Sequence, residues 1–262
     1  MTEASSHRIT SDDIYGFKLI SDPRFAPNGR RVAYVVTTIE REKNDYRSSL
    51  YVAATDGTST RRITRADAKD ASPRWSPDGT HIAFTSNRAD KSQIWMRRAD
   101  WAEAWQAATL SEGIGSFDWS PDGQSFVAVS KSTTESEAEK AKDADKADEE
   151  KSDVRHITKI RYRADGEGFL DQKPKHLWLV PAFSGEARQL TDADIDDTDP
   201  VWSPSGREIA FVTNRSEGCE MNNLSEVWSI VAHGSDERRI IGGENAAFGS
   251  PSWSPGGYRL AV

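Results

Sequence analysis

The sequence contains a single cysteine, Cys219, in 262 residues, so a disulfide bond within the chain is excluded. This scarcity is typical of proteins from reducing compartments. No stretch approaches the roughly 20 apolar residues of a membrane-spanning helix. The N-terminal segment also lacks the apolar run behind basic residues that marks a signal peptide. The sequence therefore predicts a soluble, cytoplasmic protein without a membrane partner.

Motifs for catalysis and cofactor binding are also absent. The chain has no G-x-S-x-G nucleophile elbow and no glycine-rich phosphate loop. Its five histidines are scattered, without the spacing of a metal site. We therefore predict no catalytic residue, no metal and no cofactor in this chain, and whether it is part of an enzyme stays open at this point.

The densest group of carboxylates lies in the stretch TDADIDDTDP. Asp192, Asp194 and Asp196 have the spacing of the first three ligands in a calcium loop. However, the sixth position is Asp197 where that loop needs glycine, and the twelfth is Ser203 where it needs glutamate. An acidic loop between strands is therefore favoured over a calcium site.

Basic residues are not in excess. Lys and Arg number 34 against 42 Asp and Glu, so no nucleic-acid partner is predicted. One segment, 131–153, holds nine acidic and five lysine residues and no apolar side chain larger than alanine. Such a run cannot bury enough surface to offset its ordering entropy. We predict a disordered, charged insertion, with a partner-binding tail as the alternative.

What the sequence does contain is a repeated phrase. RWSPDG at 74–79 returns as DWSPDG at 118–123, VWSPSG at 201–206 and SWSPGG at 252–257, and a weaker copy, RFAPNG, occupies 24–29. The aromatic residues of successive copies are 50, 44, 83 and 51 residues apart. Three of these intervals match the roughly 40 to 50 residues of one four-stranded propeller blade, and the fourth leaves room for an insertion.

The phrase itself has a conformational explanation. Proline fixes φ near the value that a type I turn needs, and glycine adopts a positive φ without a Cβ penalty. Together they predict a tight hairpin with a bulge. We expect the aromatic residue before the turn to fill the space between adjacent blades, which is favoured over a functional aromatic cage.

Each phrase is followed by an alternating strand, a polar turn and two further strands, which predicts an all-β protein. The expected fold is an incomplete β-propeller of four-stranded blades, with about four blades and the start of a fifth. We expect an N-terminal extension with a short helix at 1–19, followed by a partial propeller at 20–262. The predicted blades lie at about 20–64, 71–110, 116–191 and 199–242, with a fifth begun at 250. Since this fifth blade stops within its second strand, we expect the chain to be a fragment.

The third period contains an ordered hairpin insertion at 153–180. HITKIRYR alternates like a strand, and ADGEG is a turn. A hairpin rich in charged side chains on one face of a propeller is a place for ligand contact, and a structural hairpin with surface ion pairs is the alternative.

These features resemble a known family. The stretch 19–64, the W-S-P-D-G phrases followed by I-A-F, the SNR and TNR turns, and RYRADGEGFLDQKPKHLWLV resemble the N-terminal propeller of the prolyl oligopeptidase family of serine peptidases, in its acylaminoacyl-peptidase and dipeptidyl aminopeptidase branch. In that family the propeller covers an α/β-hydrolase domain and admits only short peptides. The resemblance implies a non-catalytic gating and scaffolding role here, short peptides as partners through an absent hydrolase domain, and possible homo-oligomers.

The resemblance makes four hairpin residues candidates for gating substrate at the cavity between the two domains: Arg161, Tyr162, Arg163 and Asp165. The alternative interpretation is a stand-alone TolB-like propeller that binds a protein partner. A G-x-S-x-G motif with later Asp and His residues downstream of Val262 would separate the two.

Overall fold

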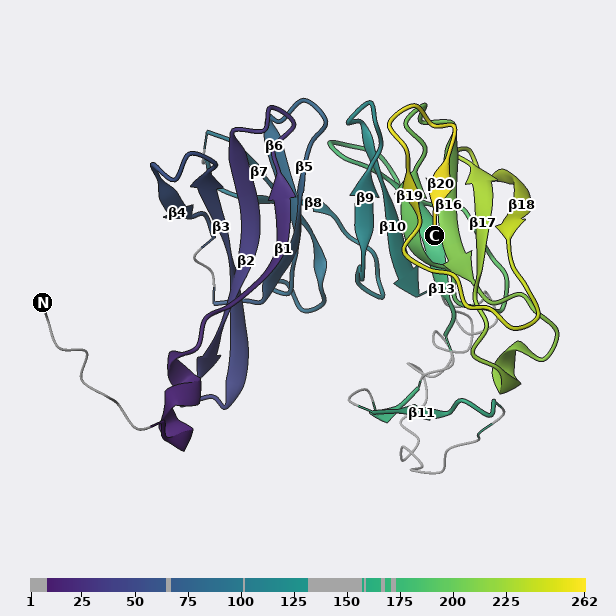
Figure 1. The fold of residues 1–262 in the computed structure, drawn as a ribbon, viewed down its shortest axis with the longest axis horizontal. Helices are drawn as coiled ribbons and strands as arrows, with labels where there is room; N and C mark the ends of the chain where they lie inside the picture. The colour runs from purple at the N-terminus through teal and green to yellow at the C-terminus, as the bar shows by residue number, and fades with distance from the viewer. Residues whose placement is uncertain are drawn as a thin grey trace, which may run out of the picture. The chain divides into compact units, whose positions relative to one another are not determined.

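The computed structural model describes residues 9–64, 67–100, 102–131, 157, 159–165, 168–170 and 173–262. Within these residues the chain forms β-strands and two short 3-10 helices, which confirms the predicted all-β class (Figure 1). None of the helices among them is long and apolar enough to cross a membrane. Apart from Lys131, the predicted charged insertion at 131–153 lies outside the described residues. The chain divides into two compact units, Met1–Thr109 and Leu110–Val262.

The first unit contains two antiparallel four-stranded sheets, and in each the strand order follows the sequence. The first sheet consists of β1 (Leu19–Phe25), β2 (Arg31–Glu40), β3 (Asp45–Ala54) and β4 (Thr60–Arg62). The second consists of β5 (Asp70–Trp75), β6 (His81–Ser86), β7 (Gln93–Arg98) and β8 (Trp105–Ala108). Strand β5 packs against β1, β2 and β3, so the two sheets share one apolar core.

A short helix precedes the first sheet. It is the 3-10 helix η1 (Ser11–Gly16), and the backbone amide of Thr10 donates a hydrogen bond to the carboxylate of Asp13 over 2.6 Å. This bond satisfies a backbone amide at the start of the helix.

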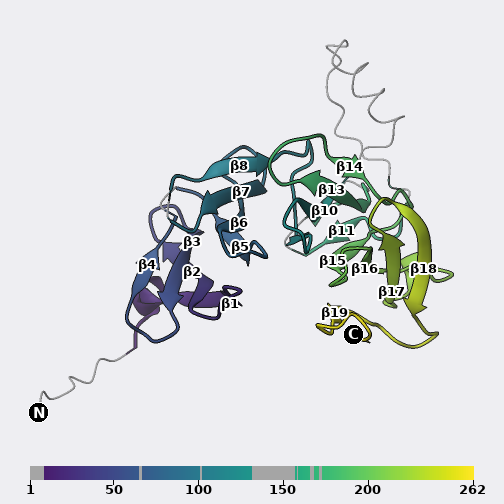
Figure 2. The ribbon, with the colours of Figure 1, turned by 90° about the horizontal axis from the view of Figure 1, so that it is seen from above.

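The second unit contains two more four-stranded antiparallel sheets and a strand pair. One sheet consists of β9 (Phe117–Trp119), β10 (Ser125–Lys131), β13 (Lys175–Pro181) and β14 (Arg188–Gln189). The other consists of β15 (Thr198–Trp202), β16 (Glu208–Thr213), β17 (Glu226–Val231) and β18 (Ser235–Ile241), and the 3-10 helix η2 (Cys219–Met221) lies between β16 and β17. The pair is β19 (Ser252–Trp253) and β20 (Leu260–Ala261). Within this unit β15 lies beside β9 and β10, and β19 lies beside β15 (Figure 2).

The repeated phrase forms a tight turn with a left-handed glycine, as predicted. In the second copy Gly79 has a φ of 70°, and its amide donates to the carbonyl of Ser76 over 2.8 Å. A Cβ on Gly79 would lie 3.4 Å from Cδ of Pro27, which belongs to the preceding phrase. A Cβ on Gly206 would likewise lie 3.7 Å from Cδ of Pro121 in its preceding phrase. Successive phrases within a unit are therefore stacked on one another.

The aromatic residue of the phrase fills the space between adjacent sheets, which confirms its predicted role. Trp75 is 8% exposed and packs with Leu50 and Val52 of the first sheet. Its indole nitrogen donates to the carbonyl of Arg24 in β1 over 3.0 Å. Phe25 occupies the same position in the first copy but is 68% exposed. No strand precedes β1 in the described chain, so the first sheet has no earlier neighbour there for Phe25 to pack against.

A second recurring feature was not predicted. Three residues before the aromatic of four phrases, a serine or aspartate adopts a φ of 47° to 53° and is followed by proline: Asp22, Ser72, Asp199 and Ser250. In the first three of these copies the strand pairing shifts register at this point. Positive φ is uncommon outside glycine, and a β-bulge bends its strand and increases the local twist. The first strand of each of these three sheets is therefore kinked at the same place.

The second and fourth sheets each bury an ion pair. Asp70 is fully buried and lies 2.7 Å from the guanidinium of Arg88. That guanidinium also lies 4.6 Å from the ring centroid of Trp95. Asp197 and Arg215 make the corresponding pair at 3.3 Å, again with a tryptophan under the arginine. The arginines come from the SNR and TNR turns, so the same turn positions the same pair twice.

The turn of the second phrase predicts a pH-dependent contribution to stability. Asp78 accepts hydrogen bonds from the Ser76 hydroxyl at 2.6 Å and the Thr80 amide at 3.0 Å, and these bonds lower the pKa of Asp78 to about 2. Since the folded pKa lies below the ordinary value, the ionised form stabilises the fold above about pH 4, and this contribution is lost as the pH falls toward 2.

We expect Asp78→Asn to cost about 1 kcal/mol at neutral pH, because the site is exposed and screened. Urea unfolding of both proteins between pH 7 and pH 3 measures this difference, which is expected to shrink below about pH 4. Asp122 makes the corresponding contacts with Ser120 and Gln124, so Asp122→Asn is expected to follow the same profile. A cost that does not change with pH would contradict the prediction.

Candidate functional site

The predicted hairpin insertion forms a small two-stranded sheet in the second unit. Strand β11 (Arg163–Ala164) pairs antiparallel with β12 (Gly168–Phe169). A further backbone bond from Leu170 to the carbonyl of Tyr162, at 2.9 Å, extends the pairing. The hairpin lies at one end of the sheets of this unit, on the side of η2 (Figure 1).

Arg161 attaches this hairpin to the loop around η2. Its guanidinium donates to the backbone carbonyl of Asn222 and, over 2.7 Å, to the side-chain oxygen of Asn223. Charge-assisted hydrogen bonds of this kind are about twice as strong as neutral ones. Arg161 therefore links the insertion in the third sheet to the connection between β16 and β17 in the fourth.

The other three predicted residues lie away from this contact. The ring of Tyr162 lies 6.3 Å from that of Phe169, and the guanidinium of Arg163 lies 5.7 Å from the same ring. Asp165 is exposed in the turn between the two strands. The structure thus brings Tyr162 and Arg163 together on Phe169, and places Arg161 and Asp165 separately.

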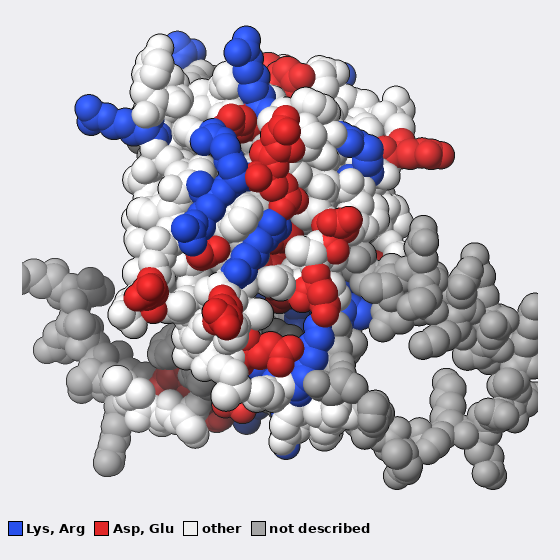
Figure 3. Space-filling model, turned by 90° about the vertical axis from the view of Figure 1, so that its right-hand side faces the viewer, with Lys and Arg blue, Asp and Glu red and all other residues white. Residues whose placement is uncertain are grey.

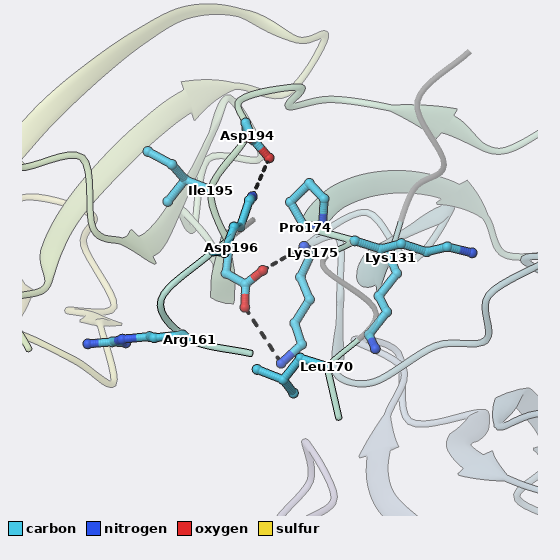
Figure 4. A pocket seen from close by; sticks show the side chains of 10 residues that line it. Lys131, Arg161, Leu170, Pro174, Lys175, Asp194, Ile195 and Asp196 are labelled. Carbon is cyan, nitrogen blue, oxygen red and sulfur yellow. Dashed lines mark hydrogen bonds and ion pairs between the residues drawn. The ribbon is translucent and has the colours of Figure 1, made fainter. Parts of the chain in front are cut away.

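A cavity of about 190 Å³ lies beside the hairpin (Figure 4). Five of its lining residues are basic and two are acidic, and the rest are apolar or proline. They are Lys131, Lys159, Arg161, Lys173, Lys175, Asp194, Asp196, Leu170, Pro174 and Ile195. Of the four predicted residues, only Arg161 lines it.

The two aspartates of the cavity bind lysines. Lys159 Nζ lies 2.8 Å from Asp194, and Asp196 accepts the backbone amide of Lys175 over 2.8 Å with Lys175 Nζ 3.8 Å away. These contacts engage two of the three aspartates that the calcium alternative requires. In the described part of the chain, no three His, Cys, Asp or Glu side chains are grouped so that they could hold a metal ion.

The lysines of this cavity were missed by sequence reasoning. Lys131 ends β10 and Lys175 begins β13, and the two are directly opposite in the sheet. Like charges opposite one another are unfavourable in a sheet unless an anion lies near them. In the sequence, Lys131 and Lys175 stand at either end of residues 132–174. Only the pairing of β10 with β13 shows that the two lysines lie side by side.

The described lining of this cavity consists mainly of charged side chains. Five basic groups against two carboxylates give a positive potential, which favours a ligand with a carboxylate or another anionic group.

The face of the second unit seen in Figure 3 has acidic and basic side chains close together. On the described part of β16–β18, Arg238 pairs with Glu208 at 2.9 Å and Arg239 with Glu226 at 3.1 Å. Arg215 additionally contacts Glu237. Acidic and basic side chains therefore pair with one another along these strands.

Comparison with known proteins identifies the family. The model of the TolB β-propeller domain, PD40, matches residues 5–160, which is more than half of the chain. The chain belongs to this family. Its four-stranded sheets are therefore blades of a PD40 propeller, and the resemblance based on the W-S-P-D-G phrases is confirmed.

Peptidases are among the relatives of this PD40 propeller. It is 31% identical over 221 residues to the uncharacterized peptidase YuxL of Bacillus subtilis, covering 84% of this chain and 33% of YuxL. It is 25% identical to dipeptidyl-peptidase 5 of Porphyromonas endodontalis, covering 95% of this chain and 36% of that protein. The chain thus spans about a third of the length of these relatives.

The fold is also similar to part of a solved structure. Pyrococcus horikoshii acylaminoacyl peptidase matches with a TM-score of 0.64 and 21% identity, over 92% of this chain and 34% of that one. At this level of identity the likeness shows the fold alone. It agrees with the antiparallel four-stranded blades of the PD40 propeller.

Proposed function

We propose that this chain is the propeller part of a serine peptidase that cleaves short peptides at an aminoacyl or acylaminoacyl end. It would gate and scaffold an α/β-hydrolase domain that carries the catalytic residues. The observation that best supports this proposal is the 31% identity to the peptidase YuxL, of which the chain spans 33%. The reaction itself is assigned to the part of the protein beyond this chain.

Two features of the structure support a gating role. The β11–β12 hairpin is held to the loop around η2 by Arg161, and the basic cavity lies directly beside it. A free peptide carries a carboxylate at its C-terminus, which a positive cavity attracts. We propose that the hairpin contacts passing peptides, with Tyr162, Arg163 and Asp165 exposed for this purpose.

We further propose that the protein acts in the cytoplasm and that the whole protein forms homo-oligomers. The cytoplasmic proposal rests on the single cysteine, which is typical of proteins from reducing compartments.

The decisive experiment uses the whole reading frame that contains this chain. We expect it to continue past Val262 into a G-x-S-x-G motif with later Asp and His residues. The purified product is expected to hydrolyse aminoacyl and acylaminoacyl nitroanilides and short peptides, but not folded casein, and a serine-directed inhibitor is expected to abolish the activity. A reading frame without that motif, or an intact protein that binds another protein and hydrolyses none of these substrates, would favour the TolB-like interaction propeller.

The gating role has its own test in the whole protein. Arg161→Ala frees the hairpin from Asn222 and Asn223, so we expect it to raise kcat/KM for a long peptide relative to a tripeptide by about three- to tenfold. Arg238→Ala removes an equal charge from an exposed pair and is expected to leave this ratio unchanged. Equal ratios in all three proteins would show that the hairpin does not gate the substrate.

A further inference from the structure

A second cavity, of about 490 Å³, lies in the first unit and has no part in the proposed gating. It is formed where β4 and the residues after it approach β7 and the connections on either side of β7. Four of its lining residues are arginines. The full set is Arg61, Arg62, Ile63, Thr64, Arg88, Arg97, Glu103 and Ala104. Its volume is within the range of about 300 to 1,000 Å³ that small-molecule sites have.

The described lining of this cavity is mainly basic. Among the described residues that line it, four are arginines and Glu103 is the one carboxylate. Arg88 pairs with Asp70, which is not among the lining residues. Arginine side chains from two different sheets are therefore gathered in one cavity.

Neutral groups hold two of these arginines in place. Arg62 donates to the carbonyl of Thr64 over 2.7 Å and to the hydroxyl of Ser49 over 2.8 Å. Arg97, only 8% exposed, donates to the carbonyl of Ala102 over 2.8 Å. Carbonyl and hydroxyl oxygens orient a guanidinium without cancelling its charge. The arginines are thus fixed before any ligand arrives, which reduces the entropic cost of binding.

Arg97 is largely buried and has like charges beside it. Burial, and then the nearby charges of Arg61 and Arg88, lower the pKa of its guanidinium. A fold that keeps like charges close together in a half-enclosed site is stabilised by an anion that enters between them. Arginine suits this purpose because its planar fork binds carboxylate or phosphate oxygens in pairs.

We propose that this cavity binds a small dianion, either a phosphate group or a pair of carboxylates on one small molecule. Arg61, Arg62 and Arg97 supply the hydrogen bonds, and Arg88 is held at the edge of the site by Asp70. Several guanidinium groups in one cavity suit a ligand with two negative charges, and the site is independent of the peptidase proposal.

The test measures binding to the full chain by calorimetry, with inorganic phosphate in one series and succinate in the other. Sodium chloride keeps the ionic strength constant, so that general screening is the same in every sample. Saturable binding of one or both anions is expected, with a matching rise in Tm. The preferred anion tells a phosphate-bearing ligand from a dicarboxylate.

Three substitutions make the result specific to the cavity. Arg61→Gln, at an exposed position, is expected to weaken binding about tenfold through loss of a charge-assisted hydrogen bond. Glu103→Gln removes the lining carboxylate and is expected to strengthen binding about threefold. Arg98→Gln is the matched control, because Arg98 neighbours Arg97 in β7 but pairs with Asp100 and is not part of the wall. It is expected to leave the affinity unchanged.

Arg61→Gln and Glu103→Gln are expected to change the affinity in opposite directions. A folding defect would weaken binding in both variants, so it can be distinguished from the expected result. The proposal is overturned if neither anion binds saturably at millimolar concentrations. It is also overturned if Arg98→Gln weakens binding as much as Arg61→Gln does, since the effect would then follow net charge and not the cavity.

Discussion

Replacing Asp197 with alanine is expected to lower the free energy of unfolding by about 3–5 kcal/mol. Asp197 is fully buried in the fourth blade and pairs with Arg215 at 3.3 Å, and Nδ1 of His176 lies 4.0 Å from its other oxygen. Removing the carboxylate leaves a largely buried guanidinium without its buried counter-charge. The cost comes mainly from that uncompensated charge, because an intact buried pair adds little net stability. Urea unfolding followed by tryptophan fluorescence measures the change.

A matched control lies on the same blade. Arg238 pairs with Glu208 at a similar distance, but its side chain is 61% exposed. Arg238→Ala is expected to cost less than about 1 kcal/mol, because water and salt screen exposed pairs. The corresponding change in the second blade, Asp70→Ala, is expected to behave like Asp197→Ala, since Asp70 has the same burial and an arginine at 2.7 Å. Similar losses for Asp197→Ala and Arg238→Ala would contradict the role assigned to burial.

Trp75→Ala is expected to cost about 3–5 kcal/mol, the usual range for removing a large buried aromatic side chain. Its ring packs between the first two blades against Leu50 and Val52, and its indole nitrogen bonds to the carbonyl of Arg24. Alanine at this position leaves a cavity between the sheets and a carbonyl without its donor. Thermal and urea unfolding of the 262-residue chain measure the loss.

Phe25→Ala is the natural comparison, because Phe25 occupies the same position of the phrase in the first blade. Since Phe25 is 68% exposed in this chain, the substitution is expected to change stability by no more than about 0.5 kcal/mol. Two substitutions in one motif are thus expected to differ by several kcal/mol because of burial alone. An equal cost for both would mean that the phrase stabilises each blade by itself and that the aromatic contributes nothing between blades.

Much of the blade architecture could be predicted from the sequence because its signals are local. Proline and glycine within RWSPDG determine the turn, and the regular spacing of Trp75 and its counterparts indicates the blade period. The kink at Ser72 was not predicted, because the local sequence carries no signal for it. A residue before proline usually avoids the helical regions, so nothing in the dipeptide Ser72–Pro73 pointed to a positive φ. In four copies of the phrase, the residue with positive φ is followed by proline. The third copy has Phe117 in place of this proline and lacks the kink, so the link between proline and kink emerges only when the copies are compared.

The candidate sites were harder to predict because they combine distant parts of the chain. Arg161 was singled out for its position in a dense hairpin, but its partner Asn222 lies in a different blade. The arginine cavity of the first unit joins Arg61 to Arg97, which belong to different sheets and are 36 positions apart in the numbering. The hydrophobic pattern of either segment does not predict that these residues lie close together. The sites form where neighbouring blades meet, whereas sequence patterns predict the strands and turns of one blade at a time.

The stacking of successive phrases has a consequence for how this protein can change during evolution. Pro27 supports Gly79, and Pro204 supports Gly257 in the same way, so an added residue in one phrase would displace the next. At the other end of the strands, β10 and β13 pair directly at Lys131 and Lys175 although residues 132–174 intervene. An insertion within a phrase is therefore expected to disturb the neighbouring blade, whereas one between β10 and β13 leaves their pairing intact. We expect variation in sequence length, and with it new binding specificity, to concentrate at the end of the blades that carries the hairpin.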